Sequence, residues 1–303
     1  MSFRRYLISA LLGCFGQVLF VSATQAATLE AAFTAVRKGN LQPIAQAKVT
    51  AKQMPELTRY LHDPNASVRR EAAVLLTSLG ASTCSALTEA LVDSDADNRE
   101  RAARSLHQLC PDIVKRVDGS GKRLRESIRL GNTSAYAFAM LGRSVDEVDK
   151  QFVLSHLGDS KTMVKREPAS PPVSIEVAAT FAAVVMGQTE GVARLPTAML
   201  PISNAEFFAA SLGEIDDRSA LLPKALAALA GLLDDRRSVS AGVPSGALPR
   251  RRVCDIAADQ VIAKLQLHST IALRVGEAYS DAELQTLKRQ FLTVRAASPP
   301  ATR

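Results

Sequence analysis

The sequence lacks most of the residue patterns that mark an enzyme or a ligand-binding cleft. It contains no Trp and only 4 Tyr among 303 residues, which argues against a carbohydrate-binding cleft lined with aromatic rings. It has no CxxC pair and no Cys/His cluster, so the cysteines predict neither a zinc site nor a thioredoxin-like redox motif. The HExxH, GxSxG and SxxK spacings are also absent. We therefore expect a protein that is not an enzyme and has no cofactor and no metal.

The N-terminal residues 1–26 predict an export signal. Arg4 and Arg5 precede the apolar run Tyr6–Val21, and small residues follow it, which is the order of regions in a cleavable signal peptide. The run is short for a membrane span of about 20 residues, so a retained anchor is the weaker interpretation. Cleavage is expected after Ala26 or Ala23, and it lowers the formal net charge from +7 to +5 because the segment contains no acidic residue.

An alternative fate of the same segment is lipidation. The sequence Leu11-Leu12-Gly13-Cys14 is similar to a bacterial lipoprotein box, in which the cysteine is acylated and becomes the first residue. Leu12 fits the pattern poorly, and the residues after Cys14 are apolar where a tether is usually polar. We expect a periplasmic or secreted protein, with a lipoprotein attached through Cys14 as the alternative.

An internal repeat dominates the first half of the chain. Residues 61–80 and 91–110 are offset by 30 positions, and eight of the twenty positions are identical. The identical pairs are Leu61/Leu91, Asp63/Asp93, Ala66/Ala96, Arg69/Arg99, Ala72/Ala102, Ala73/Ala103, Leu76/Leu106 and Leu79/Leu109. Apolar residues from Val68 to Leu79 recur on one helical face, and the turn sequence Asp63-Pro64-Asn65 precedes them. Each unit is predicted to be a short helix, a tight turn and a longer helix.

This pattern resembles the HEAT-repeat family, in particular the short repeats of bacterial and phycobilisome-lyase-like proteins. The resemblance implies an all-α fold, an α-solenoid of antiparallel helix pairs related to the HEAT and ARM superhelices. It also implies that a turn Asp and a helix Arg form a structural ladder between adjacent repeats. The residues that would form the ladder are Asp63, Arg69, Asp93 and Arg99. Asn98 departs from the pattern, because the first repeat has the apolar Val68 at that position.

The remaining sequence is also mostly helical in its periodicity. Helices are expected over 29–36, 41–49, 175–186, 205–212 and 221–233, and a Ser144–Glu147 capping box is expected to open another. The spacing of Val253, Ala257, Ala258 and Val261 repeats that of the first unit. We expect about 6–8 helix pairs in all. The predicted organisation is a signal peptide (1–26), an N-terminal array (27–164), a Pro-rich loop or hinge (165–173), a C-terminal array (174–294) and a disordered tail (295–303).

Two cysteines are predicted to form a disulfide for a geometric reason. If residues 83–92 and 96–109 form antiparallel helices, the start of the first lies near the end of the second, which brings Cys84 close to Cys110. Exported proteins retain such bridges. Two buried free thiols are the alternative. Cys254 is left over and is expected to be buried.

Two stretches concentrate positive charge. The candidate residues of an anion-facing or partner-facing surface are Lys122, Arg123, Arg125 and Arg129 in the first stretch, and Arg236, Arg237, Arg250, Arg251 and Arg252 in the second. Such runs are most often solvated surface. Neither stretch has interleaved aromatic residues, which argues against a single-stranded nucleic-acid platform.

These features give three hypotheses for function. The first is a non-enzymatic exported scaffold that binds a protein partner in the cell envelope, because stacked repeats form a long surface without a central pocket. The second is a module that binds anionic envelope lipid or polymer through the basic stretches. The third is a lyase-like enzyme, which rests on the resemblance alone. The sequence does not identify the partner.

Overall fold

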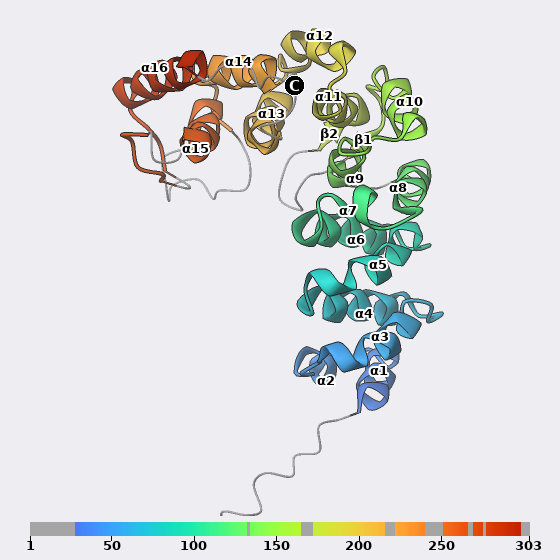
Figure 1. Ribbon diagram of the computed structural model, residues 1–303. Helices are drawn as coiled ribbons and strands as arrows, with labels where there is room; N and C mark the ends of the chain where they lie inside the picture. The colour runs from blue at the N-terminus through green and yellow to red at the C-terminus, as the bar shows by residue number, and fades with distance from the viewer. Residues whose placement is uncertain are drawn as a thin grey trace, which may run out of the picture. The chain divides into compact units, whose positions relative to one another are not determined.

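The computed structural model describes residues 28–131, 134–164, 172–215, 222–239, 251–265, 269–274 and 277–297 (Figure 1). The described residues are mostly helical with almost no strand, so the all-α fold class is confirmed. The chain divides into two compact units, Met1–Leu75 and Leu76–Arg303. The predicted signal peptide, with Cys14, Ala23 and Ala26, lies outside the described residues. The Pro-rich segment falls within the second unit and does not divide the two.

The first unit begins with a helix whose ends are set by its sequence. Helix α1 (Leu29–Arg37) starts at Thr28, whose hydroxyl accepts a hydrogen bond from the Ala31 N–H at 3.3 Å. Phe33 is fully buried, and its ring centroid lies 3.9 Å from that of Tyr60. Helix α2 (Gln42–Ala45) is shorter than the expected 41–49.

The repeated turn sequence forms the same local structure twice. In the first copy, η1 (Ala51–Gln53) and α3 (Met54–Tyr60) lead to α4 (Ala66–Ser78). The Asp63 carboxylate accepts from the Asn65 N–H at 2.9 Å. In the second copy, the Asp93 carboxylate accepts from the Asp95 N–H at 2.7 Å before α6 (Ala96–Leu109). The predicted turn followed by a longer helix is therefore present in both copies.

The first helix of the second copy is broken, contrary to the expected continuous helix over 83–92. It consists of η2 (Ala81–Thr83), α5 (Cys84–Leu87) and η3 (Glu89–Val92). The interruption falls at Thr88, whose hydroxyl donates to the Ser85 carbonyl at 2.7 Å. A threonine hydroxyl that bonds a nearby carbonyl competes with regular helical geometry.

The middle of the chain adds four helices, α7 (Ile113–Arg116), α8 (Ser120–Arg129), α9 (Ala135–Leu141) and α10 (Glu147–Ser155). Every residue of α9 is buried, and α9 packs against α6, α8, α10 and α11. The expected capping box is wrong in detail. The N-cap of α10 is Asp146, while the Ser144 hydroxyl donates to the Asp149 carboxylate at 2.6 Å.

A short strand pair frames the Pro-rich segment. Strand β1 (Met163–Val164) pairs antiparallel with β2 (Val173–Ser174), and Val164 lies opposite Val173. The ends of the segment are therefore joined by the strand pair, and residues 165–171 lie outside the described residues. Helix α11 (Ile175–Val185) follows directly and packs closely against α12 (Thr189–Ala198).

The close approach of α11 and α12 requires a glycine at position 191. A Cβ atom there would lie 2.8 Å from the Val184 nitrogen and 2.8 Å from the Ala183 Cβ. We expect Gly191→Ala to lower the free energy of unfolding by about 1–3 kcal/mol through this overlap. Gly231→Ala in α14 (Leu222–Leu232) is the matched control, because no atom beyond its chain neighbours and its own helix backbone lies within 4 Å of that Cβ position. The control is expected to be neutral or stabilising by up to about 1 kcal/mol. Equal effects in urea unfolding would contradict the prediction.

The C-terminal part contains α13 (Ile202–Ser211), η4 (Leu212–Glu214), α14, α15 (Val253–Leu265) and α16 (Asp281–Ala297). Helix α15 packs on α13, α14 and α16, and its Val253, Ala257, Ala258 and Val261 are fully buried. The spacing identified in the sequence therefore predicted the inward face of α15. The expected tail 295–303 is wrong for residues 295–297, which belong to α16. Residues 298–303 lie outside the described residues.

Candidate functional site

The repeat arginine Arg99 joins two successive turns of the second unit. Its side chain is buried and donates from Nη1 to the carbonyl oxygens of Asp93 at 2.7 Å and Ser94 at 3.1 Å. From Nη2 it donates to the carbonyls of Leu130 at 3.3 Å and Gly131 at 2.8 Å, in the turn after α8. Arg99 thus binds its own turn and the turn of the next helix pair.

The first copy of the repeat has a related arrangement within the first unit. Arg69 donates to the carbonyl oxygens of Asp63 at 2.8 Å and Pro64 at 3.1 Å. The Asp63 carboxylate forms an ion pair with Arg37 at 2.7 Å, from the end of α1. Burial alone would raise the pKa of Asp63, but the Arg37 guanidinium and the Asn65 N–H hold it below its usual value. The two predicted ladder aspartates therefore lie in turns, and the two arginines lie in the first helical turns of α4 and α6. These bonds of Arg69 and Arg99 end on main-chain carbonyls.

Two further arginines bind the main-chain carbonyls of distant turns, and the sequence analysis did not find this role for them. Arg194 of α12 donates to the Leu157 carbonyl and pairs with Glu176 at 2.6 Å. Arg237 donates to the carbonyls of Leu200 and Met199 and pairs with Asp235 at 2.5 Å. Neither arginine lies in the two repeat copies, residues 61–80 and 91–110, so the repeat spacing did not predict their contacts. The acidic neighbour Asp235 marks a turn, but it does not show which distant turn Arg237 reaches.

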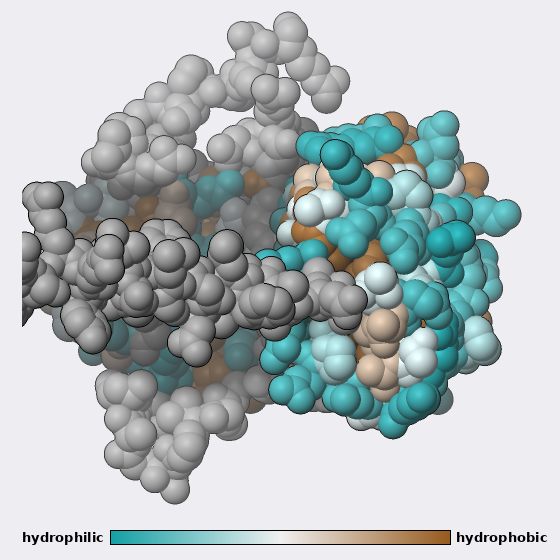
Figure 2. All heavy atoms as spheres, turned by 90° about the horizontal axis from the view of Figure 1, so that it is seen from below, coloured by the Kyte–Doolittle hydropathy of each residue, from teal (hydrophilic) through white to brown (hydrophobic). Residues whose placement is uncertain are grey.

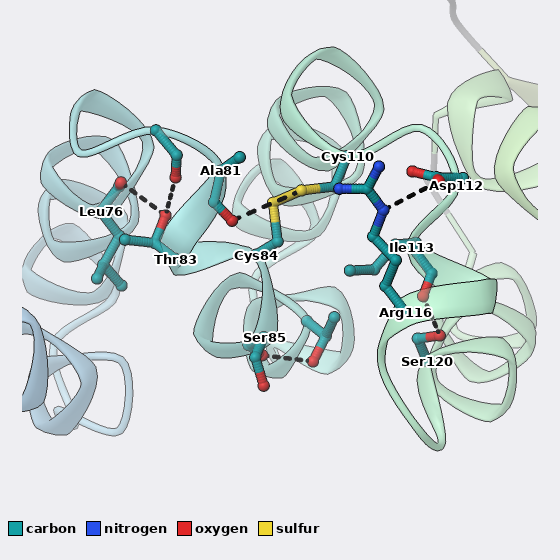
Figure 3. The surroundings of a disulfide bond; sticks show 12 residues. Leu76, Ala81, Thr83, Cys84, Ser85, Cys110, Asp112, Ile113, Arg116 and Ser120 are labelled. Atoms are coloured by element: carbon teal, nitrogen blue, oxygen red, sulfur yellow. Dashed lines mark hydrogen bonds and ion pairs between the residues drawn. A yellow bond between two sulfur atoms is a disulfide. The ribbon is translucent and has the colours of Figure 1, made fainter.

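The two cysteines paired by the sequence analysis are joined in the structure (Figure 3). Cys84 and Cys110 form a disulfide with a Cα–Cα distance of 6.5 Å. Cys84 is the first residue of α5 and Cys110 follows the last residue of α6, so the expected meeting of one helix start with another helix end occurs although the first helix is broken. Thr83, beside Cys84, donates its hydroxyl to the carbonyls of Leu76 and Gly80. Cys254 is a buried free thiol, and burial raises its pKa.

Most candidate residues of the first basic stretch contact other residues of the fold. Arg125 forms an ion pair with the buried Asp149 of α10. Arg123 donates to the Thr88 hydroxyl at 2.7 Å, and Arg129 lies over the Phe152 ring, 5.3 Å from its centroid. Lys122 is exposed and has no ion pair with another described residue. These contacts fasten α8 to its neighbours η3 and α10.

The described arginines of the second basic stretch form ion pairs with aspartates of the fold. Arg236 pairs with Asp281 at 2.9 Å, Arg251 pairs with Asp259, and Arg252 pairs with Asp255 at 2.9 Å. Arg250 lies outside the described residues. Six of the nine candidate residues therefore have a carboxylate partner, namely Arg125, Arg129, Arg236, Arg237, Arg251 and Arg252. Little of their positive charge is left uncompensated for binding an external anion.

Asp255 organises a buried polar network at the end of the chain. Its carboxylate accepts bonds from the Arg252 side chain and from the Tyr279 N–H at 3.0 Å. The Tyr279 hydroxyl donates to Asp259 at 2.8 Å, and burial is the main reason that the pKa of Tyr279 rises to about 12. The network joins α15 to the segment before α16, so it explains the position of α16.

This network predicts a pH dependence of stability. Burial alone would raise the pKa of Asp255, but the bonds from Arg252 and Tyr279 keep it below its usual value. A lowered folded-state pKa contributes stability that is complete above about pH 4 and is lost as the pH falls through the folded-state pKa. We expect Asp255→Asn to be less stable than the wild type at pH 7, with the difference shrinking below about pH 4. Urea unfolding at pH 7, 4 and 3 measures this, and a constant difference would contradict it.

Among the described parts of the chain, no three His, Cys, Asp or Glu side chains gather where a metal could bind. His107 stacks on Tyr136 with ring centroids 4.3 Å apart, and His156 packs against Phe152 and Phe138. These two histidines take part in packing. Among the coloured residues visible in Figure 2, hydrophilic residues predominate and apolar residues occupy smaller areas.

Comparison with known proteins does not assign the chain to a family. No protein-family model matches the sequence, and no curated protein matches it significantly. Within the described residues, none of the helices has the length and apolar character needed to cross a bilayer. The arrangement that the structure shows repeatedly is an arginine that binds the main-chain carbonyls of a distant turn, as Arg99, Arg194 and Arg237 do.

Proposed function

We propose that this protein is an exported, non-enzymatic scaffold of HEAT-like repeats that binds a protein partner in the cell envelope. The observation that carries the proposal is Arg99, which binds the carbonyls of two successive turns. A side chain that reaches from one helix pair to the next is what a stacked repeat array needs to keep its register. Such an array contacts partners over an extended surface.

The use of the charged side chains also supports a scaffold. A general acid or base needs a carboxylate or imidazole that is free to meet a substrate. Here Asp149, Asp255 and Asp259 are each paired with an arginine, and Asp63 is paired with Arg37. The Asp63 and Asp149 pairs join separate elements, whereas Arg251 and Arg252 lie directly before α15, the helix that carries Asp255 and Asp259.

Export is supported by two independent features of the chain. The first is the order of charged, apolar and small residues before Thr28. The second is the Cys84–Cys110 disulfide, a kind of bond that persists in oxidising compartments. Cell fractionation and the mass of the mature N-terminus test this point. Retention in the cytoplasm with an intact residue 1 would contradict export, and acylated Cys14 would show the lipoprotein form.

The scaffold is tested by crosslinking in living cells. The tagged full chain, expressed with its own N-terminal segment, is crosslinked and the proteins joined to it are identified by mass spectrometry. One dominant envelope protein is the expected result. Recovery of anionic lipid or polymer without any protein would instead favour the second hypothesis, and that binding should then weaken with salt.

A further inference from the structure

Helix α16 packs on the second unit through a narrow apolar stripe. It contacts α15 and α14 at the C-terminal end of the described chain (Figure 1). Among its described side chains, the buried large apolar ones are Leu284, Leu287 and Phe291, whereas Leu292 is 43% exposed. In α9, by contrast, every residue is buried. An element with few buried apolar contacts opens at a lower free energy than the core beside it.

Tyr279, which lies just before α16, is held by aspartates of α15. Its N–H donates to the Asp255 carboxylate at 3.0 Å, and its hydroxyl donates to Asp259 at 2.8 Å. Its carbonyl oxygen accepts from Arg252, which is itself paired with Asp255. Each of these three contacts therefore depends on a carboxylate, either directly or through Arg252. We call residues 279–297 the C-terminal segment.

Two outer ion pairs attach the C-terminal segment to the residues after α14. Asp281 accepts from Arg236 Nε at 2.9 Å, and Lys288 pairs with Asp234. The side chain of Asp281 is largely exposed, whereas that of Asp255 is fully buried. Because exposed pairs contribute little, the buried contacts of Tyr279 carry most of the polar attachment.

The charges around the C-terminal segment balance only while the carboxylates are ionised. The cations are Arg236, Arg251, Arg252, Arg274 and Lys288, and their partners in the same order are Asp281, Asp259, Asp255, Glu283 and Asp234. The other charged or titratable groups nearby are Glu206 of α13, which faces Arg251, the Cys254 thiol beside Asp255, and the Asp235–Arg237 pair. Burial raises the pKa of Glu206 and of Cys254, so neither supplies a negative charge in acid.

Acid removes the partners and leaves the cations in place, because guanidinium and ammonium groups stay charged at low pH. Arg251 and Arg252 are consecutive and only partly exposed. Protonation of Asp259 and Asp255 leaves both guanidinium groups without a counter-charge, a costly state for a group that is partly removed from water. The same protonation weakens the contacts of Tyr279.

Hydrogen bonding sets the pH at which these contacts are lost. Burial alone would raise the pKa of Asp255, but its bonds from Arg252 and Tyr279 hold it below its usual value. Bonds from Ser280, together with the Arg274 guanidinium, hold the pKa of Glu283 below its usual value. A lowered folded-state pKa gives stability that is present above about pH 4 and is lost as the pH falls through the folded-state pKa.

We propose that the C-terminal segment is an acid-sensitive latch, which releases α16 from α14 and α15 when its aspartate partners are protonated while the other helices of the second unit stay folded. Release exposes Leu284, Leu287 and Phe291 together with the surface that they cover. The Arg125–Asp149 pair also contains a carboxylate, but the helices that it joins, α8 and α10, both pack against α9 as well. The latch does not depend on the scaffold function proposed above.

Tryptophan fluorescence follows the latch in acid. The sequence contains no Trp, so a single introduced Trp reports on one position. Phe291→Trp reports on the packing of α16, and Phe138→Trp, at a fully buried position of α9, is the matched control. On acidification from pH 7 to about pH 2.5, the emission of Phe291→Trp should shift to longer wavelengths at a pH where that of Phe138→Trp is unchanged.

Amide hydrogen exchange tests the same contacts at pH 7. Asp255→Asn combined with Asp259→Asn removes the two buried carboxylate charges without acid. In this double variant, α16 amides should exchange at least about tenfold faster than in the wild type, while α6 amides keep their rates. Glu147→Gln is the control, because it removes an ion pair with Lys150 inside α10, and it should change neither helix.

Each result decides for or against the latch. A simultaneous shift of the two Trp reporters, or no shift of Phe291→Trp, would overturn it. Unchanged exchange in α16 of the double variant, or equal acceleration in α6 and α16, would also overturn it. If circular dichroism shows that the double variant does not fold, the acid titration of the two Trp variants decides alone. None of these measurements involves a partner, so failure of the latch leaves the scaffold proposal standing.

Discussion

Arg99→Ala is expected to lower the free energy of unfolding by about 3–5 kcal/mol, because it removes a buried charged donor from four carbonyl oxygens. The four acceptors belong to two different turns, so the substitution also removes the hydrogen bonds that connect one helix pair to the next. Urea unfolding monitored by far-ultraviolet circular dichroism measures the loss.

Arg101 provides a matched control on the same helix. It is exposed and has no hydrogen bond or ion pair with another described residue, so Arg101→Ala should change stability by less than about 0.5 kcal/mol. Arg99→Lys should recover only part of the loss, because an ammonium cannot reproduce the planar fork that bonds both turns. If Arg99→Ala and Arg101→Ala had the same effect, Arg99 would not connect the turns in solution.

Replacing both Cys84 and Cys110 with alanine is expected to lower the free energy of unfolding by about 3 kcal/mol. The two cysteines are 26 residues apart, and closing a loop of this size removes about that much chain entropy from the unfolded state. Unfolding of the wild type with and without a reductant should show a loss of similar size.

The Cys84→Ala/Cys110→Ala variant shows whether the reductant acts through this disulfide alone. Cys254 has no disulfide partner, so reductant should leave the stability of Cys84→Ala/Cys110→Ala unchanged. A wild-type protein whose stability is indifferent to reductant would show that the bridge does not form in the exported protein.

Local sequence signals predicted the elements that depend on neighbouring residues. Thr28 begins α1, and the Asp-Pro-Asn and Asp-Ser-Asp turns precede α4 and α6. The apolar spacing of α15 predicted which of its residues are buried. Capping, turn formation and amphipathic periodicity act within a few residues, so a single sequence is enough to detect them.

The prediction was weaker where two local signals compete. The sequence Ser144-Val145-Asp146-Glu147 contains two possible N-caps, and Asp146 is the one used because Ser144 donates to Asp149. Residues 83–92 were expected to form one helix, yet Thr88 interrupts it. At the start of α10, the contact that decides between the two N-caps is the bond from Ser144 to Asp149. Asp149 also forms an ion pair with Arg125 of α8, so this contact depends on tertiary structure.

The basic stretches show most clearly what sequence spacing leaves open. Their charge was evident, but the carboxylates that meet Arg125, Arg236 and Arg251 lie on other helices or farther along the chain. A run of arginines has the same sequence pattern whether it faces an anion in solution or an aspartate inside the fold.

The amino-acid sequence was therefore sufficient for the helical class, the repeated turn and the inward faces of several helices, since each follows from interactions between near neighbours. The tertiary structure was needed to show which turns Arg99 and Arg237 connect and which carboxylates the arginines of the basic stretches meet. Both depend on residues brought together from distant positions, as with Arg99 and Gly131, and no local pattern encodes such pairings.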